Sequence, residues 1–145
     1  MEFSAKRFEE LTTVELYEII KSRAEVFLLE QRIICQDLDD TDYKSMHFFI
    51  RSGKRMTAYL RAFYSDEEKG IVTVGRVLTL EHKKGMGSEL MKKSIEEIKK
   101  HFSCKIINVH AQKQAVGFYE KMGFHTVSEE FLEEGVIHIT MELSL

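Results

Sequence analysis

The sequence Arg76-Val-Leu-Thr-Leu-Glu-His-Lys-Lys-Gly-Met-Gly-Ser88 decides the fold of this chain, because an apolar strand runs directly into a basic, glycine-containing turn that opens a helix. Gly85 and Gly87 carry no β-carbon, so the backbone N–H groups of residues 84–88 can turn toward a ligand. The first N–H groups of a helix lack partners within it and attract negative charge, to which the lysines at 83–84 add. The stretch therefore predicts a phosphate-binding turn, and a plain strand-to-helix connection is the alternative.

Helical and extended patterns alternate along the whole chain without linkers or repeats, so we expect one domain over residues 1–145. A capping box at Thr12 and Glu15 predicts a helix that ends near residue 30. A polar, acidic loop is expected over residues 31–44. The apolar residues that recur on one face of the helix are Leu16, Ile20, Ala24 and Phe27.

Runs rich in β-branched and aromatic residues predict the strands of a sheet. Three runs separated by short turns predict an antiparallel meander at residues 47–51, 56–64 and 71–80. A helix from about residue 87 to 101 has the inner stripe Leu90, Met91, Ile95 and Ile98. After it we expect a strand at 105–109, a short helix carrying Tyr119, and closing strands at 124–130 and 136–143 around a turn at 133–135.

The strand–helix–strand unit over residues 71–110 predicts a right-handed crossover that joins two parallel strands. The expected fold class is therefore α/β, with a mixed, mostly antiparallel sheet, a central parallel pair and flanking helices. In such sheets ligands bind at the carboxyl ends of parallel strands, where neighbouring strands separate. We expect the functional site at this end of strands 71–80 and 105–110.

A second motif, Gly117-Phe-Tyr-Glu-Lys-Met-Gly-Phe124, follows a strand that ends at Val109-His-Ala-Gln112. Together with the turn His82-Lys-Lys-Gly-Met-Gly87, these segments resemble the acetyl-CoA-binding half of the GNAT superfamily of N-acetyltransferases. The phosphate loop of that superfamily has the form Arg/Gln-x-x-Gly-x-Gly/Ala, so His82 replaces the first basic or amide residue. Gln112 replaces an asparagine that is usual in the family.

The likeness extends over nearly the whole chain, mainly through its N-terminal half. Three segments and one histidine look like the ElaA branch of the superfamily: Phe27-Leu-Leu-Glu-Gln31, Gln36-Asp-Leu-Asp39, His47 and, near the C-terminus, Glu134-Gly-Val-Ile-His-Ile-Thr-Met141. This chain has no proline, whereas the ElaA pattern commonly has one after the Glu-Gln pair and one before the late histidine. The resemblance implies a GNAT-like sheet whose parallel pair splays and admits pantetheine like an additional strand.

The resemblance also implies where acetyl-CoA would bind. The backbone of Val77, Leu78 and Thr79 would lie along pantetheine and the acetyl carbonyl. The remaining residues at the coenzyme would be Lys84, Gly85, Met86, Gly87 and Ser88 around the diphosphate, together with Gln112 and Tyr119. Tyr119 matches the position at which the family uses a phenol as general acid toward the coenzyme sulfur. A core tyrosine whose hydroxyl has a structural partner is the alternative for this residue.

A lysine-like amine has an ordinary pKa of about 10.4, so a group must accept its proton, directly or through water. His110, at the end of its strand, is a candidate because histidine is the residue type that commonly accepts a proton near neutral pH. Because the acidic stretch can line the amine side and attract a cation, the alternatives are Glu30, Asp37, Asp39 and His47. Each of these, and His138 in the last strand, also has a structural explanation as a partner in helix-end, turn or buried hydrogen bonds.

Composition excludes several classes of protein. A net charge of −3 and a pI near 6.1 argue against nucleic-acid binding. No apolar run reaches about 18 residues and the first residues lack the apolar core of a secretory signal, so we expect a cytoplasmic protein without membrane contact. Cys35 and Cys104 are too few for a zinc or disulfide framework. Cys104, beside a predicted strand, is expected to be buried; Cys35 is expected to be a small apolar filler, with a reactive thiol as the alternative. The aspartates at 37–42 lack the glycine and final glutamate of a calcium loop, so no metal is expected.

The resulting hypothesis is an acetyl-CoA-dependent N-acetyltransferase that passes acetyl directly to the amine of a small molecule or peptide. The alternative is a non-catalytic acyl-CoA-binding or protein-interaction module on the same fold. A nucleotide-binding protein of the Rossmann or P-loop class is disfavoured. Gly85-Met-Gly87 lacks the third glycine of the Rossmann fingerprint, and it lacks the Gly-Lys-Ser/Thr ending of the P-loop. A homodimer remains open, since a dimer seam and an exposed edge strand look alike in sequence.

Overall fold

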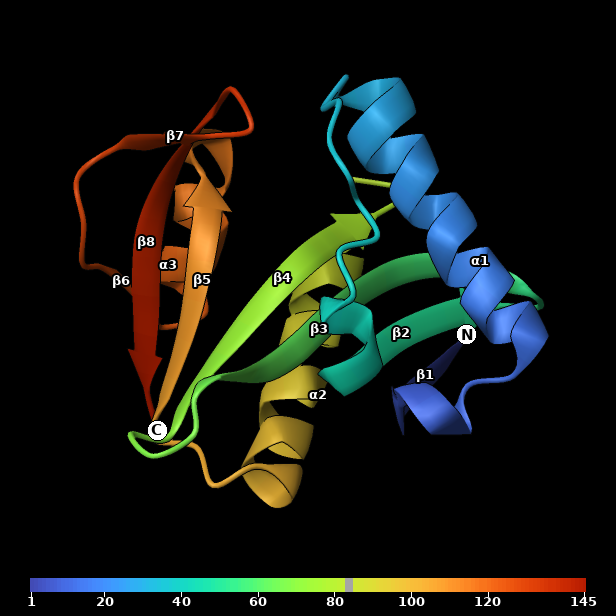
Figure 1. Cartoon of the computed structure of the whole chain (residues 1–145), viewed down its shortest axis with the longest axis horizontal. Coiled ribbons are helices and arrows are strands. Elements are labelled where there is room, and N and C mark those ends of the chain that lie inside the picture. Colours follow the sequence, from blue (N-terminus) through green and yellow to red (C-terminus); the bar gives the residue numbers. More distant parts are fainter. Residues whose placement is uncertain (83–84) are drawn as a thin grey trace.

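The computed structural model describes residues 1–82 and 85–145. Its centre is a sheet in the order β1-β2-β3-β4-β5-β8-β6, with β7 paired to β8 (Figure 1). Within the described residues β4 and β5 are parallel and the other pairs are antiparallel, which confirms the predicted mixed sheet. The strands are β1 Glu2–Arg7, β2 Met46–Ser52, β3 Arg55–Asp66, β4 Ile71–Thr79, β5 Ile106–Gln112, β6 His125–Thr126, β7 Phe131–Glu133 and β8 Val136–Ser144. The helices are α1 Thr13–Arg23, continued by a π-helix over Ala24–Glu30, then α2 Met86–His101 and α3 Val116–Lys121.

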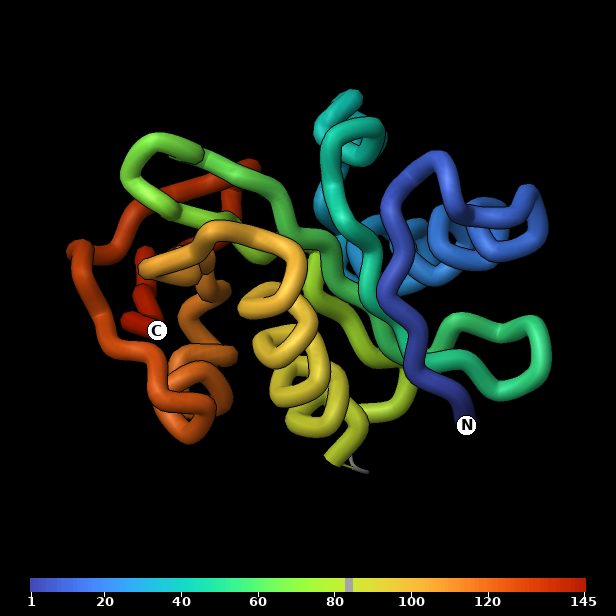
Figure 2. The backbone as a smooth tube through the Cα atoms, turned by 90° about the horizontal axis from the view of Figure 1, so that it is seen from below, coloured from blue at the N-terminus to red at the C-terminus, as the bar shows by residue number. Residues whose placement is uncertain are grey.

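Helices cover both faces of the sheet, with α1 and α2 on opposite sides of the strands (Figure 2). Leu90 of α2 and Tyr119 of α3 belong to one buried cluster with side chains from β2 to β5. Ile19 of α1 belongs to a second cluster with Phe49 and Tyr59 on the other face. The predicted inner stripe of α2 is confirmed, since all four of its residues are buried. No helix in residues 1–82 or 85–145 is long and apolar enough to cross a bilayer.

The buried face of α1 is largely polar, which corrects the predicted apolar face of this helix. Ala24 of that face is exposed, and its other three residues are only half-buried. Ser22 and Arg23 are buried in their place, beside Ile19. The Ser22 hydroxyl donates to the Met56 carbonyl oxygen at 2.7 Å, and the Arg23 guanidinium binds carboxylates. Polar side chains can occupy a buried face when each has a partner, and a hydrophobic pattern does not reveal such partners.

The edges of the sheet differ from the prediction in two places. The strand β1 was not predicted, yet it pairs with β2 along its whole length and forms one edge of the sheet. The predicted strand at 124–130 is too long, because only His125–Thr126 pair with β8 there. The Ser128 hydroxyl accepts the Thr140 N–H at 2.9 Å, so a side chain takes over from the backbone ladder and the chain leaves the sheet.

The turn before β4 is joined to the start of β5 at Gly70. The Gly70 carbonyl oxygen accepts the N–H of Lys105 at 2.7 Å. Gly70 has a φ of +69°, and a β-carbon there would lie 3.1 Å from the carbonyl oxygen of Ser103. This residue therefore holds the two parallel strands together at their amino ends.

We expect Gly70→Ala to lower the free energy of unfolding by about 2 kcal/mol or more, because a positive φ and a close backbone contact add. Gly53→Ala is the matched control: Gly53 has a φ of +61° and nothing within 4 Å of a β-carbon, so it should lose only about 1 kcal/mol. Urea unfolding measures both variants. Equal losses would contradict a steric constraint at Gly70.

Candidate active site

The strands β4 and β5 start side by side and then diverge (Figure 1). Ladder pairs join Ile71–Val74 to Ile106–Val109, and in the described part of the chain no pair joins the two strands beyond Val74 and Val109. β4 continues to pair with β3 on its other side, whereas β5 pairs with β8. Residues 77–79 therefore present a free backbone edge toward the widening space between the strands.

A β-bulge bends β4 where the divergence begins. Tyr59 and Arg61 of β3, two residues apart, pair with Leu78 and Gly75 of β4, which are three residues apart. β4 thus carries one extra residue, and Arg76 within the bulge has a φ of +54°. A bulge of this kind increases the local twist and turns a strand away from its neighbour.

The N-terminus of α2 lies beside the free edge of β4. Gly85 caps the helix with a φ of +67°. A β-carbon at Gly87 would lie 3.5 Å from Cε1 of Phe118 and 3.6 Å from Cγ2 of Thr79, so the turn, the end of β4 and the second motif meet here. Of the other residues predicted for this turn, Met86 is buried, Ser88 is half-buried, and Lys84 lies outside the described residues.

Tyr119 lies on α3, on the face of the sheet that α2 covers. Its side chain is buried in the larger core cluster, and its ring makes edge contacts with Phe118 and Phe124 at centroid distances of 5.2 and 5.5 Å. Burial raises the pKa of the Tyr119 phenol above its ordinary value. The phenol therefore keeps its proton at neutral pH.

His110 lies on the opposite face of the sheet from Tyr119. Its neighbours Val109 and Ala111 point into the core on the α2 side, so His110 points away from it, as the alternation of a strand requires. His110 Nδ1 lies 2.8 Å from Oε1 of Glu133, and both side chains are 44% exposed. The structure thus separates the two predicted catalytic side chains by the thickness of the sheet and gives His110 a carboxylate partner.

The end of the π-helix contacts the chain on both sides of the divergence. The Gln112 amide donates to Oε1 of Gln31 at 2.9 Å, at the end of β5. Nε2 of His82, just after β4, lies 3.1 Å from Oε1 of Glu30. Glu30, one of the alternative bases, is therefore already paired. The predicted coenzyme contact Gln112 faces the α1 side together with His110.

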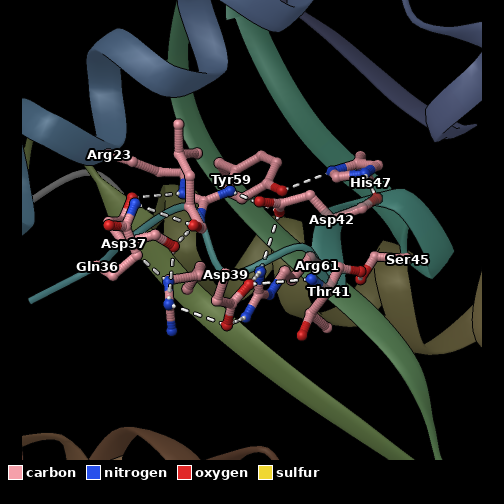
Figure 3. Close-up of polar contacts among 12 residues, drawn as sticks. Arg23, Gln36, Asp37, Asp39, Thr41, Asp42, Ser45, His47, Tyr59 and Arg61 are labelled. Atoms are coloured by element: carbon pink, nitrogen blue, oxygen red, sulfur yellow. Dashed lines mark hydrogen bonds and ion pairs between the residues drawn. The ribbon is translucent and has the colours of Figure 1, made fainter.

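A partly buried group of charged residues, which we call the Arg–Asp cluster, ties the acidic loop to α1, β3 and β4 (Figure 3). Arg23 donates to Asp37 at 3.0 Å and to Asp42 at 2.7 Å. Arg61 donates to Asp42 at 3.0 Å and through two nitrogens to Asp39 at 2.8 Å. With Arg76 added, three arginines face three aspartates. These carboxylates are therefore not free to act as bases or to attract a cationic acceptor.

The cluster lowers the pKa values of its acids. The hydrogen bond from Arg61 lowers the pKa of Asp39 well below its ordinary range. Burial by itself would raise the pKa of Asp42, but hydrogen bonds and charge from Arg23 and Arg61 outweigh burial and lower it. Among the described residues no group of three or more His, Cys, Asp or Glu side chains is arranged to hold a metal ion.

His47 extends the cluster into the core (Figure 3). Its Nε2 lies 2.9 Å from the carbonyl oxygen of Asp42 and its Nδ1 lies 2.6 Å from the Tyr59 hydroxyl. Because a carbonyl oxygen only accepts, we assign the proton to Nε2, and Nδ1 accepts from Tyr59. Burial lowers the pKa of His47, and the charges of Arg23 and Arg61 act in the same direction. His47 is thus a neutral structural histidine and not an accessible base.

The two cysteines differ from each other. Cys35 is exposed, so the filler role expected for it is wrong, and Cys104 is partly buried. Partial desolvation of this exposed side chain, followed by the charge of Glu134, raises the pKa of the Cys35 thiol. Neither environment favours a thiolate, because burial raises the pKa of Cys104 as well.

Sequence reasoning missed Glu133 and the three arginines of the cluster. Gly75-Arg76 inside an apolar strand is a signal for a bulge and could have drawn attention to Arg76. Nothing local connects residue 110 with Glu133, because the register of β5, β8 and β7 brings them together. Arg23 and Arg61 carry no local signal of this kind, because their carboxylate partners come from another segment of the chain.

Residues 44–145 match the acetyltransferase (GNAT) domain, so this chain belongs to the GNAT family of acetyltransferases. A UPF0039 protein of Schizosaccharomyces pombe is 34% identical over 149 residues, which cover 100% of this chain and 98% of that protein. ElaA of Escherichia coli is 32% identical over 145 residues, which cover 97% of this chain and 95% of ElaA. The resemblance to the ElaA branch is therefore confirmed.

Solved structures agree with the sequence relatives. The crystal structure of Escherichia coli ElaA superposes with a TM-score of 0.91 at 30% identity and covers 99% of each chain. An acyl-CoA N-acyltransferase from Pseudomonas aeruginosa also gives a TM-score of 0.91, at 28% identity, over 99% of this chain and 100% of that one. The GNAT fold is thus shared along the whole length.

We expect stability to fall as the pH drops from about 7 to about 5, in part because of His47. The unfolded chain binds a proton at this residue near pH 6.5, whereas the folded state, with its lowered pKa, does not. His47 therefore contributes stability above this range that is lost as the pH falls, with a slope of up to about 1.4 kcal/mol per pH unit. Asp39 and Asp42 change the pH dependence of stability only at lower pH, because an ordinary aspartate titrates near 3.9.

Urea unfolding at a series of pH values measures this dependence. His47→Gln should be less stable at pH 7 and should show a shallower slope than the wild type. The exposed His125→Gln is the matched control and should keep the wild-type slope. A wild-type slope in His47→Gln would exclude the buried neutral histidine as its source.

Proposed function

We propose that this chain is an acetyl-CoA-dependent N-acetyltransferase that transfers the acetyl group directly to an amine. The observation that carries the proposal is the meeting of three features in a member of the GNAT family: the free backbone edge of β4, the N-terminus of α2 and the aromatic face of α3. Separately each feature is common, whereas together they suit a long thioester with a diphosphate at one end.

The described residues fit such a co-substrate in two respects. The free edge of Val77, Leu78 and Thr79 offers backbone N–H and C=O groups that an extended pantetheine amide chain can pair with, as an added strand would. The first turn of α2 offers N–H groups without partners inside the helix, and they favour a diphosphate. Acetyl-CoA, when bound, supplies an activated acetyl group.

Tyr119 is the proposed general acid. Its buried phenol is protonated at neutral pH because burial raises its pKa, so it can donate a hydrogen bond and a proton to the departing thiolate. The close approach of Gly87 to Phe118, the residue before Tyr119, places α3 beside the first turn of α2, within the proposed co-substrate site.

His110 is the proposed base, with Glu133 as its orienting partner. When Nδ1–H of His110 donates to Glu133, Nε2 is left as an acceptor for the proton of the incoming amine, directly or through one water. The acid and the base then act from opposite faces of the sheet, on the two sides of the space between β4 and β5. That arrangement suits a direct transfer in which amine and thiol occupy different sides of the carbonyl.

The acceptor in this proposal is an amine of a small molecule or a peptide. Three of the four aspartates of the acidic loop, Asp37, Asp39 and Asp42, are matched by arginines, so long-range attraction of a polycation is not part of the proposal. We infer neither a nucleic-acid nor a membrane partner. A homodimer remains compatible with the exposed edge strand.

Calorimetry with CoA and acetyl-CoA tests the binding half of the proposal. We expect both to bind and pantetheine, which lacks the diphosphate, to bind far more weakly. Ser88→Asp places a negative charge in the first turn of α2 and should weaken CoA by about tenfold while leaving pantetheine unchanged. Ser103→Asp, just after the other end of α2, is the charge control. Absence of CoA binding at millimolar ligand would defeat the proposal.

Release of free thiol from acetyl-CoA in the presence of an amine panel tests the catalytic half. Tyr119→Phe removes the proton donor but keeps the ring in the core, so turnover should fall by about 100-fold while CoA affinity changes little. An unchanged rate would remove Tyr119 from the mechanism. If the wild type binds CoA and releases no thiol with any amine, the non-catalytic acyl-CoA-binding module becomes the better explanation.

A further inference from the structure

The backbone of Arg76 is in a conformation that its side chain makes costly. Its φ of +54° lies in the left-handed region, where a residue with a β-carbon is disfavoured and glycine is not. Gly75, its neighbour, would avoid that cost but does not have a positive φ. A residue held in this way needs compensating contacts elsewhere.

The compensating contacts come from the acidic loop. Nε of Arg76 donates to Oδ1 of Asp37 at 2.8 Å, and its Nη2 donates to the Asp37 carbonyl oxygen at 2.9 Å. The same nitrogen reaches Oδ2 of Asp39 at 3.3 Å. The Arg76 side chain is 26% exposed, so these contacts are partly shielded from water. Two nitrogens of the Arg76 guanidinium thus bind the carboxylate and the carbonyl oxygen of the same residue, Asp37. Such a two-point contact defines both the position and the orientation of the Arg76 side chain.

Asp37 is itself fixed from the other side. Its Oδ2 accepts from Nε of Arg23 at 3.0 Å, and its carbonyl oxygen accepts from Nη2 of Arg23 at 2.9 Å. The Arg23 side chain on α1 is only 1% exposed. Asp37 is thus held between one guanidinium from α1 and one from the bulge of β4, and the loop joins the two elements.

We propose that Arg76 and Asp37 are positioning residues that hold the β4 bulge, and through it keep β4 and β5 apart for the co-substrate. The extra residue of the bulge sets which way Val77, Leu78 and Thr79 face, because a shift of one residue turns every side chain to the other side. Without the bulge, β4 can extend its ladder with β5 beyond Val74 and Val109 and close the space. This role rests on the proposed function.

Four substitutions test the pair through CoA affinity. Asp37→Asn and Arg76→Ala should each weaken CoA binding by roughly tenfold or more, because a charge-assisted contact is lost. Arg76→Gly should bind CoA better than Arg76→Ala, because glycine adopts the positive φ without steric cost. Arg76→Lys keeps the charge but not the fork and should restore part of the affinity. Wild-type affinity in both Asp37→Asn and Arg76→Ala overturns the proposal.

The kinetic constants distinguish a positioning role of Arg76 and Asp37 from a purely structural ion pair. In the thiol-release assay the KM for acetyl-CoA should rise more than kcat falls, since the reacting groups themselves are untouched. Arg51→Ala, which removes an arginine paired with Glu2 and Glu15 at the far edge of the sheet, is the matched control and should change neither constant. A fall in kcat alone would overturn the positioning role.

A readout without ligand separates this inference from the proposed function. In a crystal structure of Arg76→Ala, residue 76 should leave the left-handed region and pairing of β4 with β5 should extend past Val74. An unchanged bulge overturns the positioning role even if the wild type binds CoA. If the wild type binds no CoA, the proposed function fails, while a bulge lost in Arg76→Ala still supports Arg76 and Asp37 as its anchor.

Discussion

The whole structure depends on two parallel strands that pair at one end and are kept apart at the other. Four ladder pairs join β4 to β5, and Gly70 anchors them where they start. Beyond Val74 and Val109 each strand takes its remaining hydrogen bonds from its other neighbour. Sheets normally satisfy their backbone groups on both sides, so a free edge in the middle of a sheet is unstable unless the chain bends and a ligand or solvent occupies the space.

This constraint explains why the proposed site has parts on both faces. The helix that follows β4 must cross one face to reach β5, and its N-terminus therefore lies next to the free edge. The side chains of β5 alternate, so Val109 and Ala111 complete the core under α2 while His110 and Gln112 reach the face of α1. An extended thioester in this space would be in contact with both faces at once, which is what a direct transfer between thiol and amine requires.

The charged core around Arg23 and Arg61 has a second consequence for the same site. Buried guanidinium and carboxylate groups are expensive to desolvate, and such clusters rarely increase stability relative to apolar packing. Here the cluster joins α1, the acidic loop and the bulge, three segments far apart in the chain. Its value is geometric: removing one partner leaves others uncompensated, so the segments keep one arrangement.

The sequence by itself determined the order of the elements from α1 to β5, the parallel pair, the α2 stripe and the family, because these follow from local hydrophobic period and from contiguous motifs. It did not reveal the edge strand β1 or the short strand β7. It misjudged the inner face of α1 and the strand at 124–130, where Ser22, Arg23 and Ser128 find partners from distant residues. Tertiary structure alone decided which carboxylates are free, that His110 meets Glu133, and that Arg76 adopts a positive φ. The reason is physical: hydrogen-bond partners between distant segments are set by strand register and packing, and neither is encoded in the spacing of neighbouring residues.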